Sequence, residues 1–504
     1  MEGYFPGLDE FCSLCEQGDV IPVCKELLAD ALTPVSAYRR LAISDGNKAA
    51  DYAFLLESVV GGENVARYSF VSSDPAMMIR ASGDEIKKTY SDGRSETLKG
   101  HDPLEELHKV LAGYRPVHPA SLPRFTGGLV GYAGYDTVRY YENLGPGPLD
   151  DRGLPVLNFG LYRTMVIFDH VFKTIKVVAN AFVKNSPEKA YAEAVELVES
   201  VIARLKVPAD VDIASAGTSS VPDVDFESNF TRAEYMDMVE GCREYISAGD
   251  IFQVVPSQRL SVKTGATPFE CYRSLRVINP SPFMFILKTP EVSLVGSSPE
   301  ILCRVENGIV TSRPLAGTRP RGDTQEADWE LERELLADAK ERAEHTMLVD
   351  LARNDVGRVA EPNSIKLSEL MTVERYSHVM HIVSDVKGKL AEGMTAFDAL
   401  KAALPVGTVS GAPKIRAMEI IDEFEPTMRG PYAGGVGYMD FCGNMDTCIA
   451  IRTIVFAGGK IYIQAGGGVV ADSDPATEYQ ETLNKARALL RSIAVAERST
   501  GIRP

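Results

Sequence analysis

The length, composition and charge of the chain exclude several classes of protein. At 504 residues the chain is long enough for two or three domains, or for one large fold. Hydrophobic residues make up 45% and charged residues 24% of the sequence, which excludes wholesale disorder and collagen-like or low-complexity structure. The formal net charge is −17, so the chain has no general attraction for nucleic acid or anionic lipid. An anionic ligand would have to be held by local groups.

The cysteines and the N-terminal residues indicate a cytoplasmic setting. Eight cysteines in a chain of this length form no disulfide framework, so we expect a reducing compartment. Cys12 and Cys15 form a C-x2-C pair, but no second Cys or His pair follows at a suitable spacing, which does not favour zinc. The first residues lack the features of a signal peptide, and no apolar run of about 18 residues occurs, so neither export nor membrane spanning is expected.

The first two hundred residues predict an irregular mixture of strands and helices, typical of an α+β fold rather than of regular βαβ units. The segment Val207–Val224 is rich in Pro, Gly, Ser, Thr and Asp and has neither a helical nor a strand period, which predicts a linker. We therefore expect an N-terminal domain over residues 1–206, a linker over 207–224 and a second domain over 225–504. The strands predicted before the linker are Arg67–Ser72, Gly128–Tyr135 and Met165–Asp169, and the helices are Pro103–Ala112 and Pro187–Leu205.

The second half has stronger patterns and predicts antiparallel sheet flanked by long helices. The β-branched runs Asp446–Phe456 and Lys460–Gln464 are separated by Ala-Gly-Gly, which indicates a hairpin. Helices are predicted from about Gln325 through Leu351, from Pro413 to Phe424 with Pro413 in the first turn, and from Pro475 to Ala496.

Two acidic residues on these helices are candidates for chemistry. Glu344 shares a helical face with the apolar residues Met347, Leu348 and Leu351, so it either needs a cation or lies at the edge of the stripe and reaches water. Glu481 and Lys485 are four residues apart, the ordinary spacing of an exposed helical ion pair. From the pattern alone, the solvent-exposed interpretation is favoured for both sites.

The segment before the last predicted helix contains groups that could bind an anion. Gly466, Gly467 and Gly468 follow a predicted strand, and their backbone N–H groups could approach an anion, although a glycine run is equally a flexible turn. Arg452 lies on the otherwise apolar face of the strand Asp446–Phe456, so it either pairs with a protein carboxylate or binds a ligand carboxylate. His378 and His381 form H-x-x-H without a zincin pattern, which favours a single histidine as proton carrier.

Taken in order, eleven segments between about residues 225 and 495 resemble the chorismate-utilising enzymes, and most closely the large, component I, subunits of anthranilate synthases. A looser match, LLESVVGGENVARYSFV (Leu55–Val71), lies in the first half. The resemblance implies an α+β fold in which antiparallel sheets form a sandwich core with flanking helices. The matching strings are QVVPSQR (253–259), NPSPFMF (279–285), GSSPE (296–300), RPLAGTRPRG (313–322), AEHTMLVDLARND (343–355), VERYSHVMHIVSDV (373–386), LPVGTVSGAPK (404–414), YAGGVGY (432–438), DTCIAIRT (446–453), QAGGGVV (464–470) and ETLNKA (481–486).

The resemblance also implies a substrate and a set of site residues. The substrate is chorismate, and a Mg²⁺ ion would be held by Glu344 and Glu481, against the solvent-exposed interpretation of both. Glu300 matches the acid that protonates the departing 4-hydroxyl group, and His381 matches the histidine that assists the loss of pyruvate. The positions that match chorismate-binding residues are Gly317, Thr318, Tyr432, Arg452, Gly466, Gly467, Gly468 and Lys485.

Two positions bear on which reaction the family member performs. Isochorismate and salicylate synthases carry a Lys base where this chain has Gln253, and aminodeoxychorismate synthases commonly carry a nucleophilic Lys at the position of Ala316. With neither lysine present, the resemblance implies external ammonia as the nucleophile, amination at ring carbon 2, loss of the 4-hydroxyl and elimination of pyruvate to give anthranilate, the first step of L-tryptophan biosynthesis. Aminodeoxychorismate synthase component I remains the alternative, and a sensor without turnover is disfavoured because Glu344 and Glu481 are both present.

Partners and regulation also follow from the resemblance. The chain shows no G-x-C-x-G glutaminase elbow, so a separate glutamine amidotransferase small subunit is expected, in the family's common arrangement of two large and two small subunits. Ser58, Pro282 and Met284 match a feedback site for L-tryptophan. Phe283 replaces the usual Tyr there and keeps the ring without the hydroxyl.

Overall fold

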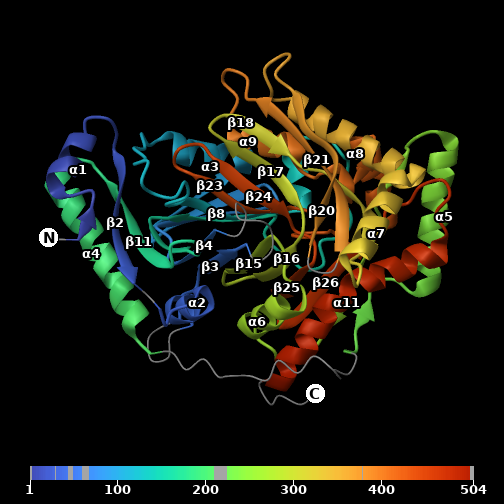
Figure 1. Ribbon diagram of the computed structural model, residues 1–504, viewed down its shortest axis with the longest axis horizontal. Helices are drawn as coiled ribbons and strands as arrows, with labels where there is room; N and C mark the ends of the chain where they lie inside the picture. The colour runs from blue at the N-terminus through green and yellow to red at the C-terminus, as the bar shows by residue number, and fades with distance from the viewer. Residues whose placement is uncertain are drawn as a thin grey trace.

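The computed structural model describes residues 3–28, 30–43, 49–58, 67–208, 224–376 and 379–499. In this part of the chain, two large sheets lie face to face and helices cover their outer sides (Figure 1). The strand pairings of both large sheets are antiparallel, so the predicted α+β fold with a sandwich core is confirmed. Most of the predicted linker, residues 209–223, lies outside the described residues, as does His378.

The first sheet contains strands from both sides of the predicted linker. Its junction is the pairing of β3 with β15, in which Glu57 lies opposite Met284. Its strand order is β1 (Tyr4–Phe5), β2 (Val20–Leu28), β11 (Thr174–Phe182), β10 (Thr164–Asp169), β4 (Tyr68–Ser73), β3 (Ala53–Glu57), β15 (Phe283–Lys288), β16 (Ser293–Ser298), β25 (Thr453–Ala457), β26 (Lys460–Gly466), β14 (Ser257–Val262) and β12 (Glu227–Ser228).

The second sheet is built in the same mixed way, with β8 of the first half paired to β23 of the second. Its order is β19 (Leu315–Pro320), β21 (Val379–Lys389), β18 (Ile309–Ser312), β17 (Ile301–Glu306), β24 (Met445–Ile449), β23 (Gly435–Asp440), β8 (Gly128–Ala133), β9 (Leu157–Tyr162), β5 (Met77–Ser82), β6 (Glu85–Tyr90) and β7 (Ser95–Lys99), while β20 (Lys366–Arg375) pairs with β21. A separate short pair consists of β13 (Gln253–Val254) and β22 (Gly411–Ala412).

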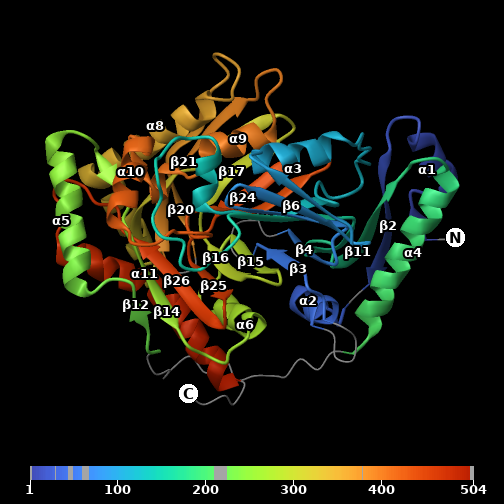
Figure 2. The same cartoon turned by 180° about the vertical axis from the view of Figure 1, so that it is seen from behind.

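Helices pack on the outer faces of the two sheets. Figure 2 shows α2 and α6 beside the first sheet, whose helix-facing core includes Tyr38 and Tyr272, and α3 and α9 beside the second. The helices are α1 (Leu8–Leu14), α2 (Pro34–Ala42), α3 (Pro103–Ala112), α4 (Pro187–Lys206), α5 (Arg232–Ala248), α6 (Pro268–Ile278), α7 (Gln325–Ala337), α8 (Ala339–Gly357), α9 (Ala396–Ala403), α10 (Lys414–Phe424) and α11 (Pro475–Ser499), with 3-10 turns η1 (Tyr135–Tyr140) and η2 (Gly407–Val409).

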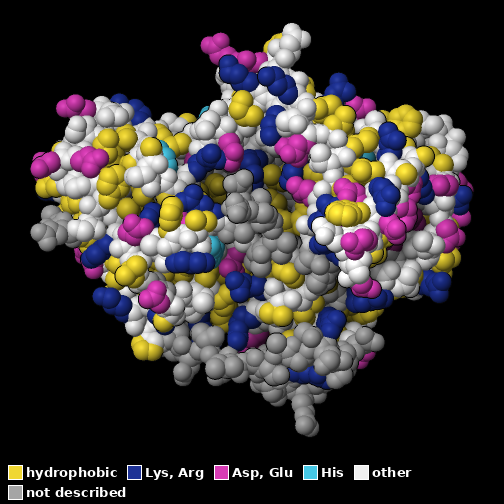
Figure 3. Space-filling model, in the orientation of Figure 1, with side chains coloured by type: hydrophobic (Ala, Val, Ile, Leu, Met, Phe, Trp, Pro, Cys, Tyr) yellow, Lys and Arg dark blue, Asp and Glu magenta, His cyan; other side chains and the backbone are white. Residues whose placement is uncertain are grey.

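The core between the sheets is apolar and draws on both. Phe54 of β3 and Phe285 of β15 pack there with Val130 of β8 and Val436 of β23, all buried. Because both faces of these strands are covered, by the opposite sheet and by helices, their side chains are apolar on both sides rather than in alternation. On the face shown in Figure 3, acidic and basic side chains are interspersed, and no described helix is long and apolar enough to cross a membrane.

Two predicted elements are wrong, and both errors fall next to the site described below. The predicted strand Asp446–Phe456 is two strands in different sheets, β24 and β25, and the chain passes between the sheets at Arg452, whose φ is +50°. The predicted helix from Gln325 through Leu351 is two helices, because Asp338 ends α7 and caps α8 through its side chain. Pro413 is the N-cap of α10 rather than a first-turn residue.

Candidate active site

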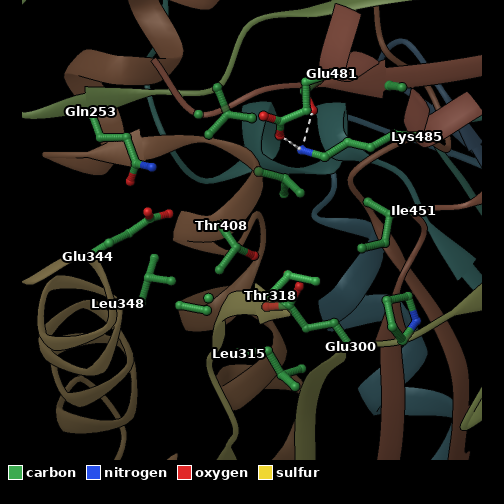
Figure 4. A pocket seen from close by; sticks show the side chains of 18 of the residues that line it. Gln253, Glu300, Leu315, Thr318, Glu344, Leu348, Thr408, Ile451, Glu481 and Lys485 are labelled. Carbon is green, nitrogen blue, oxygen red and sulfur yellow. Dashed lines mark hydrogen bonds and ion pairs between the residues drawn. The ribbon is translucent and has the colours of Figure 1, made fainter. Parts of the chain in front are cut away.

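A cavity of about 600 Å³ lies between α8, α11 and the ends of strands from both sheets. Figure 4 shows how side chains distant in the sequence converge on it, with Glu344 from α8 at the left and Glu481 from α11 at the top. Eleven of the predicted substrate, metal and catalytic residues line it: Glu300, Gly317, Thr318, Glu344, His381, Tyr432, Arg452, Gly466, Gly468, Glu481 and Lys485. The tertiary structure therefore gathers the predicted positions into one place.

Besides Glu300, four carboxylates line this cavity, and two of them pair with cations, Glu341 with Arg319 and Glu481 with Lys485. Glu341 and Glu344 come from α8, and Glu478 and Glu481 come from α11. The pKa of the Glu344 carboxyl is raised by burial and by the nearby Glu341 and Glu481 charges. Carboxylates gathered in this way, with Glu478 buried and the other three half-buried, repel one another unless a cation joins them.

The donors present suit magnesium. Mg²⁺ prefers oxygen ligands and usually takes one or two protein carboxylates while retaining water molecules, and one buried oxygen of Glu478, Oε2, has no hydrogen-bond partner. Among the described residues, no three acidic, histidine or cysteine groups converge into a complete protein cage. The arrangement thus fits an ion held by a few carboxylates and completed by water or substrate, rather than an ion enclosed by protein.

Two cations line the cavity beside these carboxylates. The Lys485 ammonium pairs with Glu481 at 2.6 Å and donates to the Gly466 carbonyl at 2.9 Å. Arg452 donates from Nη1 to the Lys485 carbonyl at 2.8 Å, and burial lowers the pKa of its guanidinium. Within the described residues no carboxylate pairs with Arg452. Of the two interpretations left open by the sequence, the guanidinium facing a ligand is therefore the one that the geometry favours.

Glu300 follows β16 and lies deep in the cavity, where 8% of its surface is exposed. Burial raises the pKa of its carboxyl to about 8, against smaller opposing effects of Thr408 and Lys485. The carboxyl is therefore protonated near neutral pH and can act as a general acid. Figure 4 places its side chain near Thr318 and Thr408.

The histidine is held in one tautomer by its neighbours. His381 lies on β21, and its Nδ1 is 3.0 Å from the Gly317 carbonyl oxygen and 3.1 Å from the Thr318 hydroxyl. A carbonyl oxygen only accepts, so Nδ1 carries the proton and Nε2 keeps its lone pair. Burial lowers the pKa of His381, which leaves a neutral imidazole able to take a proton.

The glycine run was predicted to offer three backbone N–H groups to an anion, and Gly467 differs from this prediction. Gly466 and Gly468 line the cavity, but the Gly467 N–H is already bound to the Pro256 carbonyl at 3.2 Å. A Cβ atom at Gly467 would lie 2.8 Å from Glu478 Oε2, and one at Gly468 would lie 2.6 Å from Gln253 Nε2. The glycines thus let the backbone pack closely against polar side chains of the wall.

Several lining residues were not singled out in the sequence. Glu478 precedes Glu481 by one helical turn on the same side of α11, a spacing that could have identified it. Thr408 and Gln464 lie in matching strings, but only the tertiary structure shows that their polar atoms face the cavity. The oxygen atoms Thr408 Oγ1, Gln464 Oε1 and Gln253 Oε1 are buried and without a hydrogen-bond partner.

The predicted tryptophan-site residues meet in a second cavity, of about 390 Å³. Ser58 follows β3, Pro282 precedes the neighbouring strand β15, and Phe283 and Met284 are the first residues of β15. Phe125 and Tyr438 stack on its wall with ring centroids 3.8 Å apart, and Ser58 Oγ is buried without a partner. A cavity lined by aromatic rings and by charged side chains such as Arg67 and Glu57, with an unpaired hydroxyl, suits an aromatic ligand that carries charged or polar groups.

Comparisons with known proteins agree with this site. The family model described as chorismate binding enzyme matches residues 51–491. Anthranilate synthase component 1 from Acetivibrio thermocellus is 45% identical over 98% of this chain and 99% of its own, and that from Pseudomonas aeruginosa is 46% identical over 97% and 99%. The crystal structure of anthranilate synthase component I from Streptococcus pneumoniae TIGR4 matches with a TM-score of 0.76 and 38% identity, over 92% of this chain and 98% of that one.

A more distant structure shows the same fold. The menaquinone-specific isochorismate synthase from Escherichia coli is 18% identical and has a TM-score of 0.69 over 96% of this chain and 98% of its own. The resemblance drawn from the motifs is confirmed by these matches and by the convergence of the motif residues on one cavity. The chain belongs to the chorismate binding enzyme family.

Proposed function

We propose that this protein is the large subunit of an anthranilate synthase, converting chorismate and ammonia to anthranilate, pyruvate and water. The observation that carries the proposal is that the cavity wall, over the residues that the structure describes, offers no unpaired amine as a nucleophile. Gln253 and Ala316 both line it, so neither position offers an amine. The lysines that line it in the described chain, Lys340 and Lys485, are paired with Asp472 at 3.1 Å and with Glu481 at 2.6 Å. An external nucleophile is therefore needed.

The residues divide the chemistry between an acid and a base. The lone pair of ammonia forms the bond to ring carbon 2, and both ring double bonds shift, from C1=C2 to C1=C6 and from C5=C6 to C4=C5. The bond from carbon 4 to its hydroxyl breaks. Glu300 supplies the proton with which that hydroxyl leaves as water, and the new ammonium group loses a proton. In the second step the proton on carbon 2 is lost and the bond from carbon 3 to the enolpyruvyl oxygen breaks. The released enol gains a proton at its methylene carbon to become pyruvate. Nε2 of His381 would assist this loss of pyruvate.

Binding of the substrate uses charges of both signs in the wall of the cavity. Arg452 and Lys485 suit the substrate's carboxylates. Glu344 and Glu481 would hold a Mg²⁺ ion, which supplies positive charge for a substrate carboxylate when it is bound. In this way a chain with a net charge of −17 can bind a dianion.

The test is turnover with purified protein, chorismate, Mg²⁺ and an ammonium salt. We expect the fluorescence of anthranilate to appear without any added lyase. An aminated product that still carries the enolpyruvyl group would instead indicate aminodeoxychorismate synthase, and no aminated product at all would refute the proposal. Glutamine alone should not replace the ammonium salt, because ammonia from glutamine would come from a separate glutaminase subunit, expected in a complex of two large and two small subunits.

We further propose that L-tryptophan binds in the second cavity and inhibits the enzyme. Support comes from the strand pairing, since Phe283 lies opposite Ser298 in the β15–β16 pair, two residues before Glu300. A ligand that displaces the start of β15 would therefore shift the general acid. Tryptophan should inhibit turnover, and Ser58→Ala should raise the concentration needed for half inhibition, whereas Ser95→Ala on the exposed strand β7 should not. Unchanged inhibition in the Ser58 variant would place the inhibitor elsewhere.

A further inference from the structure

A fully buried ion pair lies directly behind the active-site cavity. Arg429 and Glu425 are 2% and 3% exposed, and their side chains make two hydrogen bonds, of 2.9 Å from Nε and 2.5 Å from Nη2. Arg429 also donates to the carbonyls of Val255 and Val409, each at 2.7 Å. Every buried charge of the pair is therefore compensated, which is the condition for keeping such a pair inside a protein.

The ion pair reaches the cavity through one hydroxyl group. Glu425 Oε1 is 2.8 Å from both the backbone nitrogen and the Oγ of Ser257. An ionised carboxylate only accepts hydrogen bonds, so the Ser257 hydroxyl must donate its proton to Glu425. Ser257 Oγ can then only accept from its next neighbour, the side-chain amide of Gln464, whose Nε2 is 2.8 Å away.

This chain of donors and acceptors fixes which way the Gln464 amide is turned. Its nitrogen must face Ser257, and its oxygen must face away, toward the cavity that Gln464 lines. That oxygen is buried and has no hydrogen-bond partner, in a residue that is 8% exposed. An unpaired buried acceptor is costly, and it indicates a donor that is bound during function.

The nature of the missing donor follows from the chemistry of the substrates. Gln253, which is 4% exposed, presents a second unpaired carbonyl oxygen, Oε1, in the wall of the same cavity. The carboxylates of chorismate offer no donor, and its single hydroxyl is the group assigned to Glu300, whereas ammonia offers three N–H groups and one lone pair. Neutral acceptors can hold its N–H groups and leave the lone pair free to attack.

We propose that the side-chain oxygen of Gln464 binds the ammonia nucleophile, and that the relay Arg429–Glu425–Ser257 keeps that oxygen turned toward it. Gln464 is a binding residue for the second substrate, and Ser257, Glu425 and Arg429 are positioning residues that act through it. The inference rests on the proposed function, because it needs ammonia to be a substrate.

The test measures the KM for ammonia and the KM for chorismate separately. Gln464→Met retains an unbranched side chain of similar length without the carbonyl. We expect its KM for ammonia, measured with saturating chorismate, to rise about 3- to 10-fold, which corresponds to one neutral hydrogen bond. Its KM for chorismate should stay within about twofold. If the Met variant does not fold, as judged by circular dichroism, Gln464→Asn withdraws the oxygen by one methylene and should show the same selective change.

The relay is tested by a double-mutant cycle. Ser257→Ala removes the acceptor that holds the Gln464 nitrogen, so we expect a selective but smaller rise in the KM for ammonia. Adding Ser257→Ala to Gln464→Met should raise it no further. The matched control is Gln258→Met, since Gln258 is equally buried on β14 but bonds to Ser228 and Thr482 outside the cavity. It should leave the ratio of the two Michaelis constants unchanged.

The outcomes distinguish this inference from the proposed function. If the wild-type protein makes no anthranilate from chorismate and ammonium, the proposed function fails and this inference fails with it. If the wild type is active but the Gln464 variants change both Michaelis constants equally, or only kcat, Gln464 does not bind ammonia while the proposed function stands. If Ser257→Ala raises the KM for ammonia by the same factor in the Gln464→Met variant as in the wild type, the relay is overturned, while the binding of ammonia by Gln464 stands.

Discussion

The buried acid Glu300 makes a prediction that links activity to stability. Replacing it by Gln keeps the shape of the side chain and removes the proton that it can donate. We expect turnover to fall by roughly 100- to 10,000-fold, the usual contribution of a general acid. The same substitution should make the protein more stable at neutral pH, because burial opposes the ionised form of Glu300 and Gln has no ionised form.

The magnitude follows from the raised pKa. Burial moves the pKa of Glu300 from 4.5 to about 8, so the folded protein must take up a proton at any pH between these values. A raised carboxyl pKa leaves stability intact below 4.5 and lowers it progressively as the pH rises to about 8. At about 1.4 kcal/mol per pH unit, the ionisable side chain costs roughly 3 kcal/mol at pH 7 relative to a neutral one.

The measurement is the free energy of unfolding of both proteins in urea at pH 5 and at pH 8. The advantage of Glu300→Gln should grow by about 3 kcal/mol between the two pH values. Glu392→Gln, at an exposed position in the loop before α9, is the control for replacing a glutamate by glutamine as such. A difference for Glu300→Gln that is the same at both pH values would refute the assignment of a buried, protonated acid.

Three further substitutions test other parts of the site. Glu344→Gln should remove most of the Mg²⁺-dependent turnover without unfolding the protein, and wild-type activity at saturating Mg²⁺ would exclude Glu344 as a ligand. Ala316→Lys places an amine in the cavity wall and should suppress anthranilate formation; normal rates of anthranilate production would show that this position does not select the nucleophile. Gly317→Ala should lower stability by about 1 to 2 kcal/mol and raise the KM for chorismate, because Gly317 has a φ of +65° and its new Cβ would lie 2.9 Å from Leu335; an unchanged Tm would contradict this.

Elements with strong local signals were predicted well. Helix α3 spans Pro103–Ala112 as predicted, because Asp102 caps it and Pro103 starts it. The hairpin of β25 and β26 turns at Gly458 and Gly459, which both have positive φ and so meet the demand of a tight two-residue turn. In each case the deciding interactions lie within a few residues.

The errors arose where distant contacts override a local pattern. The run from Asp446 to Phe456 reads as one strand, yet residues 450–452 carry the chain from one sheet to the other, which no local propensity reveals. The prediction that Arg452 lies on the apolar face of a single strand was therefore wrong, although the residue does line the cavity. The break at Asp338 was missed because the helical pattern continues on both sides of a side chain that caps the second helix.

The sequence by itself determined the family, the two sheets in outline and many of the residues in the cavity, though not Glu478, Thr408 or Gln464, because the order and spacing of short motifs specify these without any distance information. Only the tertiary structure decided how those residues act. Burial makes Glu300 an acid, the Gly317 carbonyl sets the tautomer of His381, and a buried ion pair behind the wall turns the Gln464 oxygen inward. Protonation states and hydrogen-bond directions depend on neighbours brought together from distant segments, and a linear pattern does not contain those neighbours.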